Sequence, residues 1–348
     1  MAYHTTDGGQ AEMDTYKLLF LSQEDIIGLD LAYEDVIDAV EKVMSAHAKG
    51  LCQLPSKIHV NPLEGTYLNA MPAYIGGDFN MCGLKWVSGY PSNRQKGLPV
   101  TWGIMVLNDY STGAPLAVMD AHWITAVRTA AVAAVTAKYC AKKDVSAMTI
   151  IGAGEQGKWN ARLMKIVRPS IRKIYIGDIY PQALEAYLAK MQPLLPDTEI
   201  IPIHDDAERR KAIDDSDILL TATQRSDRPI IFCEMLHPGM LGIPLESTAW
   251  EGKTYTSADR FVCDDKGLVE TYYRDGKYTD GLPEKIYTIG EIINGDAPGR
   301  LNDDEFVIAS SHGVALSDVI LAQMIYDKAT ERGVGEFLPL LRQGDIIR

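Results

Sequence analysis

The feature that most constrains the fold is a cluster of glycines directly after the short apolar run Ala-Met-Thr-Ile-Ile. Gly152 permits a tight turn, Gly154 lets the backbone approach a pyrophosphate, and Gly157 allows a helix to pack closely on the preceding strand. Since a helical stretch follows, this pattern predicts a dinucleotide-binding turn between a strand and a helix. The candidate cofactor-binding residues of this turn are Gly152, Ala153, Gly154, Glu155, Gln156 and Gly157.

An acidic residue further along indicates which dinucleotide would bind. Asp178 lies 21 residues after Gly157, at the end of the segment Lys-Ile-Tyr-Ile-Gly-Asp. A carboxylate at this place hydrogen-bonds both hydroxyls of an adenosine ribose and repels a 2′-phosphate. Residues 179–182 contain no Lys or Arg that would hold such a phosphate. The sequence therefore favours NAD over NADP.

The pattern of apolar residues divides the chain into two kinds of structure. Beyond residue 147, short apolar segments alternate with amphipathic helical stretches, which is typical of a doubly wound parallel sheet. Residues 57–107 instead form short β-rich segments separated by Gly, Pro and Asn, which indicate an antiparallel or mixed sheet. An Ala-rich helix over 121–141 joins the two, and amphipathic helices are expected at 33–49 and 314–328. The expected fold is α/β, with a Rossmann-type sheet and a second, α+β domain.

Charge and composition exclude several other classes of protein. With 34 Lys+Arg and 47 Asp+Glu among 348 residues, the net charge of −13 disfavours nucleic acid or a membrane surface as a partner. The polar N-terminal stretch and the lack of a long apolar run predict a cytoplasmic protein. Five cysteines without a C-x-x-C pair indicate no disulfide framework, and the histidines show no metal-ligand spacing, so no metal site is expected.

Several further motifs occur in one order along the chain. They are Met-Pro-Ala-Tyr at 71–74, Gly-Leu-Lys-Trp at 83–86, and the stretches 107–121, 125–139, 290–300 and 310–318, together with the glycine turn. With these motifs the chain resembles the ornithine cyclodeaminase/mu-crystallin family from about residue 18 to 333. The resemblance implies a homodimer with a Rossmann domain at 127–313. It also implies a substrate-binding and dimerisation domain formed by 1–126 with 314–348.

The resemblance also assigns candidate site residues. Lys85 and Arg128 match positions that hold the substrate carboxylate, and Lys57 lies near a third such position. The charge of the chain agrees with this assignment, because an acidic protein needs fixed cations to bind an amino-acid carboxylate, and Arg suits bidentate contact. The resemblance adds three candidate cofactor-binding residues: Thr129, Thr223 and Ser311.

The chain departs from the family at the positions that engage the amino groups of ornithine. Asn69 replaces an acid just before the Met-Pro pair. In the loop after the fourth Rossmann strand, Arg225 stands where an Asp is usual, and Asp227 lies two residues further on. A site without two carboxylates binds a diamine poorly. Ornithine is therefore disfavoured, and this loop is closer to the dehydrogenase and reductase branch. Residues 239–253 also lack the usual Gly/Ala-rich stretch, so the wall facing the nicotinamide is expected to differ.

His312 lies where the family reads D-S-x-G beside the nicotinamide. A His there could protonate the product amine or hydrogen-bond the substrate, because the usual pKa of His lies near working pH. A plain loop His exposed to water is the alternative. The candidate catalytic residues are therefore Lys57, Asn69, Lys85, Arg128, Asp227 and His312.

The leading hypothesis is an NAD-dependent oxidoreductase acting on the C–N bond of an α-amino or α-imino acid, as an amino acid dehydrogenase or an imine reductase. Two alternatives stay open. One is a cyclodeaminase-like lyase that uses NAD catalytically to cyclise a diamino acid with loss of ammonia. The other is a binding protein without turnover, like the crystallin member of the family. Analogy of fold does not choose among the three.

Overall fold

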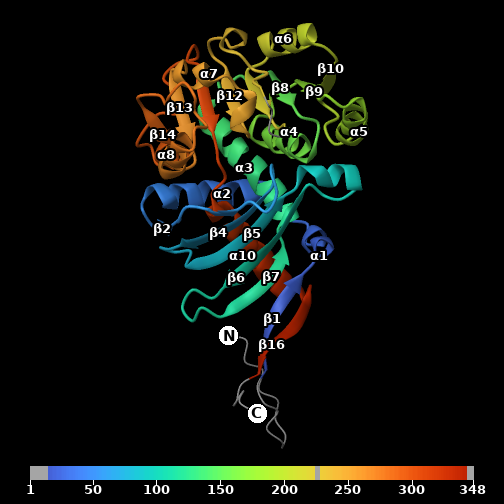
Figure 1. Cartoon of the computed structure of the whole chain (residues 1–348), viewed down its shortest axis with the longest axis vertical. Helices are drawn as coiled ribbons and strands as arrows, with labels where there is room; N and C mark the ends of the chain where they lie inside the picture. Colours follow the sequence, from blue (N-terminus) through green and yellow to red (C-terminus); the bar gives the residue numbers. More distant parts are fainter. Residues whose placement is uncertain (1–14, 224–227, 343–348) are drawn as a thin grey trace, which may run out of the picture.

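The computed structural model describes residues 15–223 and 228–342. Within these ranges the chain forms two eight-stranded sheets, one above the other in the long direction of the molecule (Figure 1). The long helix α3 (His122–Cys140) runs between them, as the Ala-rich stretch predicted. The α/β class expected from the sequence is confirmed.

The lower sheet is mixed and contains strands from both ends of the chain. Its order is β16-β1-β7-β6-β5-β4-β2, with β3 paired to β4. Strand β1 is parallel to β7, and the other pairs are antiparallel. The strands are β1 (Thr15–Leu21), β2 (Cys52–Gln53), β3 (Ile58–Val60), β4 (Tyr67–Ile75), β5 (Met81–Gly89), β6 (Thr101–Asn108), β7 (Pro115–Asp120) and β16 (Glu336–Arg342).

The upper sheet is parallel throughout, in the order β10-β9-β8-β11-β12-β15-β13-β14. Its strands are β8 (Ala147–Ile151), β9 (Lys173–Gly177), β10 (Glu199–Ile203), β11 (Ile218–Thr221), β12 (Leu241–Pro244), β13 (Arg260–Cys263), β14 (Ile286–Thr288) and β15 (Val307–Ser310). The helices that follow these strands are α4 (Glu155–Val167), α5 (Pro181–Met191), α6 (Asp206–Asp214), α7 (Gly252–Thr256), α8 (Lys266–Arg274) and α9 (Ile289–Ile293). This arrangement confirms the doubly wound sheet predicted from the alternation of strands and helices.

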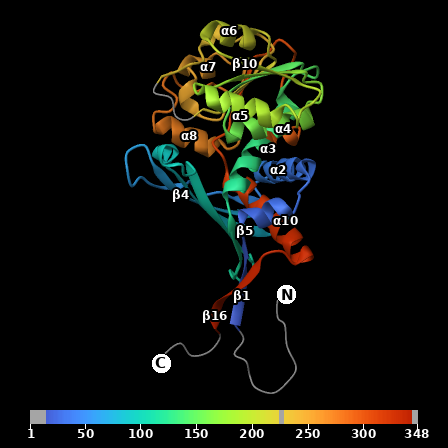
Figure 2. The same ribbon diagram turned by 90° about the vertical axis from the view of Figure 1, so that its right-hand side faces the viewer.

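Three further helices belong with the lower sheet: α1 (Gln23–Gly28), α2 (Tyr33–Ala48) and α10 (Ala315–Arg332). Helix α1 starts in a capping box made by Ser22 and Asp25. Helix α10 packs on β4, β5 and β6 and ends at Gly333 in the left-handed conformation. The turned view places β1 and β16 together at the far end of the molecule (Figure 2).

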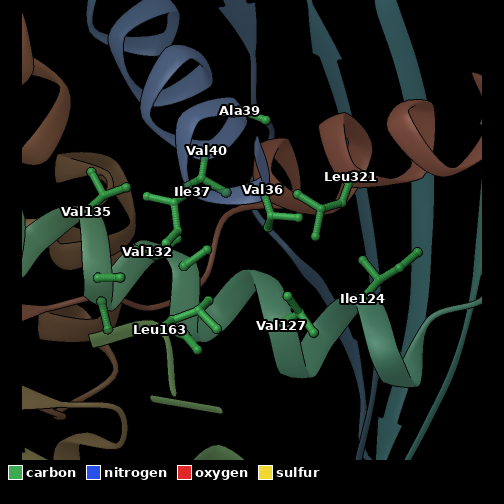
Figure 3. Close-up of a cluster of buried hydrophobic side chains, with 14 of the residues drawn as sticks. Val36, Ile37, Ala39, Val40, Ile124, Val127, Val132, Val135, Leu163 and Leu321 are labelled. Carbon is green, nitrogen blue, oxygen red and sulfur yellow. The ribbon is translucent and has the colours of Figure 1, made fainter. Parts of the chain in front are cut away.

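One hydrophobic cluster joins the two sheets through α3. Figure 3 shows side chains of α2, α3, α4 and α10 meeting in this cluster. The residues labelled there are Val36, Ile37, Ala39, Val40, Ile124, Val127, Val132, Val135, Leu163 and Leu321. Since α3 is buried from both sides along most of its length, it fixes the position of each sheet against the other.

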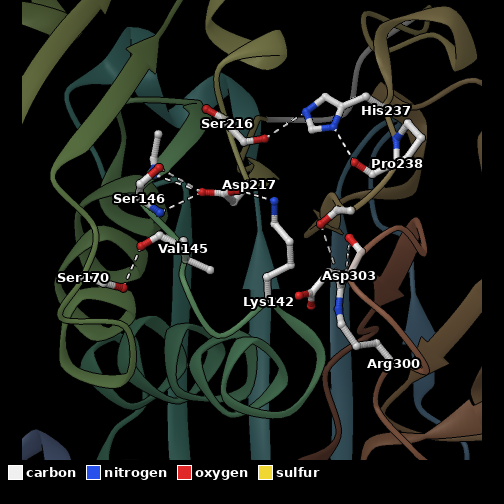
Figure 4. A network of polar contacts seen from close by, with 12 residues as sticks. Lys142, Val145, Ser146, Ser170, Ser216, Asp217, His237, Pro238, Arg300 and Asp303 are labelled. Atoms are coloured by element: carbon white, nitrogen blue, oxygen red, sulfur yellow. Dashed lines mark hydrogen bonds and ion pairs between the residues drawn. The ribbon is translucent and has the colours of Figure 1, made fainter.

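A polar network ties the amino ends of the parallel strands together (Figure 4). The Asp217 carboxylate accepts a hydrogen bond from the Ser146 amide at 2.7 Å and pairs with Lys142 Nζ at 2.7 Å. His237, which precedes β12, places its Nε2 3.1 Å from the Ser216 carbonyl oxygen. This edge lies opposite the carboxyl ends of the strands, where ligands bind in such sheets, so we assign the network to stability.

Each of the five cysteines is a free thiol, consistent with the sequence prediction. Among the described residues no helix is both long and apolar enough to cross a bilayer. The domain limits expected at residues 126/127 and 313/314 stay a prediction.

Candidate active site

The glycine turn has the geometry that a dinucleotide requires. Gly152 has φ +120°, and a Cβ there would overlap the carbonyl oxygen of Ala222 in the neighbouring strand connection. A Cβ at Gly157 would overlap the carbonyl oxygen of Gly152, so the helix approaches the turn as closely as predicted. Gly154 is the N-cap of α4 and has open space where its Cβ would be. The amides at the start of α4 therefore face a space that a pyrophosphate fits.

Asp178 lies directly after β9 and beside this turn. Its carboxylate accepts hydrogen bonds from the Ala153 amide at 2.8 Å and the Tyr180 amide at 3.0 Å. These two bonds hold the carboxylate at the edge of the turn, where a ribose would lie. Glu155 instead contacts its own helix, since its side chain accepts the Trp159 indole N–H at 2.7 Å.

A cavity of about 230 Å³ opens at the carboxyl ends of β11, β12 and β15. It brings together six of the residues that the sequence singled out, and also reaches Glu246 in the connection after β12. The predicted residues lining it are Arg128, Thr129, Gln156, Thr223, Ser311 and His312. Gln156 of the glycine turn and the buried cation Arg128 therefore line the same cavity.

Arg128 belongs to a buried ion cluster that links β5, α3 and α10. Asp318 of α10 accepts Lys85 Nζ at 2.8 Å and Arg128 Nε at 3.0 Å through the same oxygen, Oδ1. The Lys85 and Asp318 side chains are 1% and 0% exposed, so the cluster is shielded from water. Because one carboxylate faces two cations, the cluster retains a positive charge for an anionic group.

Lys57 is a third buried cation close enough to Arg128 to interact with it electrostatically. Its ammonium donates to the carbonyl oxygen of His312 at 2.6 Å and lies over the Tyr272 ring. Burial lowers the pKa of Lys57 to about 8, against the opposing charge of Asp264. Burial and the neighbouring Arg128 lower the pKa of Lys85 to about 7. Lys57 and Lys85 do not themselves line the cavity, so Arg128 is the predicted cation that reaches it.

His312 differs from the expectation based on its usual pKa. Its ring stacks on Tyr272 with centroids 4.1 Å apart, and its Nε2 lies 2.7 Å from the Tyr278 hydroxyl. Burial lowers the pKa of His312 to about 4. The imidazole is therefore neutral at working pH and is a hydrogen-bond partner there, not a source of protons. The expectation of a proton donor with a pKa near neutrality is wrong on this point, and a binding role for His312 stays a prediction.

The two candidates for an amine-binding role are Asn69 and Asp227. Asn69 shares a sheet face with Lys85, but its Oδ1 faces His59 Nδ1 at 2.7 Å and it does not line the cavity. Asp227 and Arg225 lie outside the described residues. Within the described part of the chain, no three His, Cys, Asp or Glu side chains are placed to hold a metal ion.

Sequence reasoning missed several residues that shape the site. Asp318 lies within the motif at 310–318, and the signal that could have identified it is an acid in the apolar first half of α10, which requires a buried partner. Asp264 accepts the Gly313 amide at 2.7 Å, and Tyr278 contacts His312; both come from strand connections without a local pattern. Glu246 lies in the stretch 239–253, which the sequence marked as unusual.

Known proteins are similar to this chain along most of its length. The model of the ornithine cyclodeaminase/mu-crystallin family matches residues 17–333. Over 333 residues the chain is 31% identical to the alanine dehydrogenase of Archaeoglobus fulgidus, which covers 93% of this chain and 99% of that protein.

Solved structures are similar along the same length. The Δ1-pyrroline-2-carboxylate reductase of Thermococcus litoralis, solved in complex with NADH and L-proline, has a TM-score of 0.82 and 31% identity. The match covers 92% of this chain and 99% of that one. An archaeal alanine dehydrogenase dimer with bound NAD has a TM-score of 0.83 and 28% identity, over 94% of this chain and 100% of that one.

Proposed function

Because the chain belongs to the ornithine cyclodeaminase/mu-crystallin family, we propose that it is an NAD-dependent oxidoreductase acting on the C–N bond of an α-amino or α-imino acid. The observation that carries this proposal is the shared cavity, in which Gln156 of the nucleotide turn and Arg128 of the ion cluster line one space. The relatives named above are an amino acid dehydrogenase and a cyclic-imine reductase, whose chemistry needs this arrangement.

The cofactor of this proposal is NAD, held by the residues of the glycine turn. Bound NAD or NADH supplies the acceptor or donor of a hydride at the α-carbon of the substrate. The amides of the first turn of α4 would face the pyrophosphate. Asp178, whose carboxylate is held by the Ala153 amide, would receive the ribose hydroxyls. The Asp178 carboxylate would repel a 2′-phosphate, which supports NAD over NADP.

Arg128 holds the substrate carboxylate. Asp318 engages only its Nε, and the outer guanidinium nitrogens lie against Gly313 at the cavity wall. A guanidinium fixed through Nε presents its two outer nitrogens as a fork, which matches a carboxylate. Lys85 orients this fork through Asp318 and adds positive charge, while the cationic Lys57 strengthens the local field. Holding the carboxylate in this way places the α-carbon at a fixed position in the cavity, which is the main contribution expected of the protein.

The cyclodeaminase-like alternative has less support. Asn69 replaces an acid of the diamine site and its amide oxygen is engaged by His59. A buried distal ammonium needs an anionic partner, and Asn69 does not supply one. A turnover assay distinguishes the proposed enzyme from the binding-protein alternative, because a binding protein would bind NADH and ligand without consuming either.

We also propose a homodimer formed through the lower sheet. Trp86, Trp102 and Ile104 lie on the face of β5 and β6 opposite Lys85 and are 38%, 50% and 47% exposed. Adjacent large apolar side chains on one sheet face are typical of an interface. A Trp102→Glu variant should therefore sediment as a monomer, whereas an unchanged dimer in that variant would exclude this face.

The function is tested by following NADH absorbance with purified protein. We expect NADH oxidation with cyclic imines or with 2-oxo acids plus ammonia or methylamine, and slower turnover with NADPH. An Arg128→Gln variant should lose this activity through a raised KM for the imine and keep its affinity for NADH. Ammonia and proline formed from ornithine with NAD, without net absorbance change, would contradict the oxidoreductase and establish the lyase.

A further inference from the structure

A buried carboxyl group lines the cavity at a place that the proposed function does not yet use. Glu246 follows β12 (Leu241–Pro244) directly, and its neighbours Ile243 and Leu245 line the same wall. Arg128 and His312 line this cavity as well. Glu246 therefore shares the enclosed space in which the substrate carboxylate would be bound, and it comes from the stretch where this chain departs from its family.

The Glu246 carboxyl group is not part of the ion pairs that occupy the other buried acids. Both of its oxygens are buried, and neither has a hydrogen-bond partner of good geometry among the described residues. The hydroxyl of Thr223, which also lines the cavity, is equally without such a partner. By contrast, Asp318 and Glu305 each face a cation. A buried polar group without a partner is costly, so its retention in a cavity indicates that a ligand satisfies it.

The groups around Glu246 favour its neutral form. Burial raises the pKa of Glu246 to about 8, and the hydroxyls of Thr221 and Thr223 and the Thr223 amide offset only part of this effect. The buried Tyr255 of α7 also interacts electrostatically with Glu246. Arg128 and the neutral His312 are the titratable groups across the cavity, and Asp318 already faces Arg128. At neutral pH the carboxyl group thus carries a proton that it can give away, since the best general acids have a pKa near working pH.

The other candidates for this proton are less suitable. His312 is neutral at working pH because burial lowers its pKa to about 4. Lys85 donates to Asp318 and does not line the cavity, and the Lys57 ammonium donates to the His312 carbonyl. Among the described residues that line the cavity, Glu246 is the only Asp or Glu, and so the only side chain with a carboxyl group.

We propose that Glu246 is the general acid of the reaction, giving its proton to the nitrogen of the bound imino acid. This inference rests on the proposed function. When the α-carbon of the C=N bond receives a hydride from the reduced nicotinamide, the C=N π bond breaks and its electron pair moves to nitrogen. A new N–H bond forms with the Glu246 proton, leaving a carboxylate that water reprotonates. In the oxidative direction the Glu246 carboxylate accepts the proton of the amine.

The proposal is tested with Glu246→Gln, which keeps the shape of the side chain and cannot titrate. With NADH and a cyclic imine at pH 7, we expect kcat to fall by about 10²–10⁴-fold, the usual contribution of a general acid. The Kd for NADH should stay within about twofold, because the nucleotide turn is untouched. The wild-type kcat for reduction should fall as pH rises through about 8, the pH at which Glu246 loses its proton, and this limb should vanish in the variant.

Glu251→Gln is the matched control, because it removes an acid from the same strand connection that contacts the Cys233 amide and does not line the cavity. Its kcat and pH profile should equal those of the wild type. Glu246→Asp keeps an acid at shorter reach and should retain more activity than the Gln variant. As a readout that does not need turnover, the infrared carbonyl band of a protonated carboxyl should disappear above about pH 8 in the wild type and be missing in Glu246→Gln.

Each other outcome overturns the inference. A wild-type enzyme that reduces imines together with an equally active Glu246→Gln variant would exclude the general acid while leaving the proposed function intact. A variant that loses NADH affinity and keeps its kcat would show that Glu246 positions the nicotinamide. The lack of a titrating carboxyl band would exclude a protonated Glu246. A wild-type protein without turnover on any imine would overturn the proposed function and this inference together.

Discussion

The two halves of the active site are built in opposite ways. The nucleotide turn consists of backbone geometry, with Gly152, Gly157 and Asp178 close together in the sequence. The cation cluster consists of buried charges from distant segments, since Asp318 lies 233 residues from Lys85 and 190 from Arg128. A site made of backbone conformation is specified locally, whereas a site made of charge requires the completed fold.

This difference predicts which half is coupled to stability. The nucleotide turn lies at the carboxyl end of β8, where Gly154 and Glu155 are exposed to water. The Lys85–Asp318–Arg128 cluster is desolvated, so each ion depends on the others for compensation. Damage to the turn should therefore affect cofactor affinity, and damage to the cluster should affect both folding and substrate binding.

The largest effect is expected from Asp318→Ala. Removing the shared carboxylate leaves Lys85 and Arg128 buried without their anion, which should cost about 3–5 kcal/mol of unfolding free energy. Urea unfolding followed by circular dichroism measures this loss. Asp327→Ala on the exposed side of the same helix is the control and should change stability by less than about 0.5 kcal/mol. If both variants lost a similar amount of unfolding free energy, the buried cluster would contribute no more to stability than an exposed side chain does.

A second substitution tests the orientation of the Arg128 fork. Gly313 has φ +77°, and a Cβ there would lie 2.8 Å from Arg128 Nη1. Gly313→Ala should therefore displace the guanidinium and raise the KM of the substrate by about 10–100-fold, the equivalent of one charged hydrogen bond of about 1.5–3 kcal/mol.

Gly333→Ala is the matched control for this variant. Gly333 has φ +66° and open space where its Cβ would be, so it has similar backbone strain without a contact to Arg128. Both variants should lose about 1 kcal/mol of stability, but only Gly313→Ala should bind substrate weakly. Equal KM values in the two variants would argue against Arg128 as the carboxylate-binding residue.

The nucleotide half is tested by Asp178→Asn. The neutral amide weakens the bonds to the ribose and no longer repels a 2′-phosphate. We expect the Kd for NADH to rise about tenfold, for a loss of about 1.5 kcal/mol at this part-exposed position, and the preference over NADPH to shrink. Stability should change little, in contrast to Asp318→Ala. Fluorescence titration of the reduced cofactor gives both constants, and an unchanged ratio between them would remove Asp178 from cofactor selection.

The contrast between the halves also explains what the sequence could predict. The glycine turn, the parallel sheet and the helices α2, α3 and α10 follow from local spacing and periodicity, and the structure confirms them. Strands β2, β7 and β16 of the lower sheet were not foreseen, and the last two show why. Strand β16 contains Pro339 and is exposed along its length, and it becomes a strand only by pairing with β1 across the whole chain. Strand β7 follows a turn and pairs with β1 in parallel, a register that no local pattern encodes.

The same limit applies to the charged residues. Lys85 and Arg128 were identified because a family resemblance marks them, but their shared partner Asp318 has no local signal beyond an acid among apolar neighbours. The expectation for His312 relied on the usual pKa of His, whereas burial beside Tyr272 and Tyr278 lowers the pKa of this residue. Burial is a property of the assembled fold. Candidate site residues can therefore be predicted from the sequence, but their protonation states cannot.

The smallest expected effect is a dependence of substrate affinity on pH. Burial lowers the pKa of Lys85 to about 7 and that of Lys57 to about 8, so both lysines are charged below these values and lose their charge as pH rises through them. The field that attracts the substrate carboxylate therefore weakens between about pH 7 and 8. Losing one cation at this distance costs about 1 kcal/mol, so KM should rise roughly fivefold over this range.

A Lys57→Arg variant keeps a fixed charge and should show a smaller rise in KM. The Kd for NADH should not change over this pH range in either protein. The change in KM is separable from the loss of kcat assigned to Glu246, because only kcat should respond to Glu246→Gln. A KM that stays level from pH 6 to 9 would mean that Arg128 alone holds the carboxylate and that the lysines serve the fold.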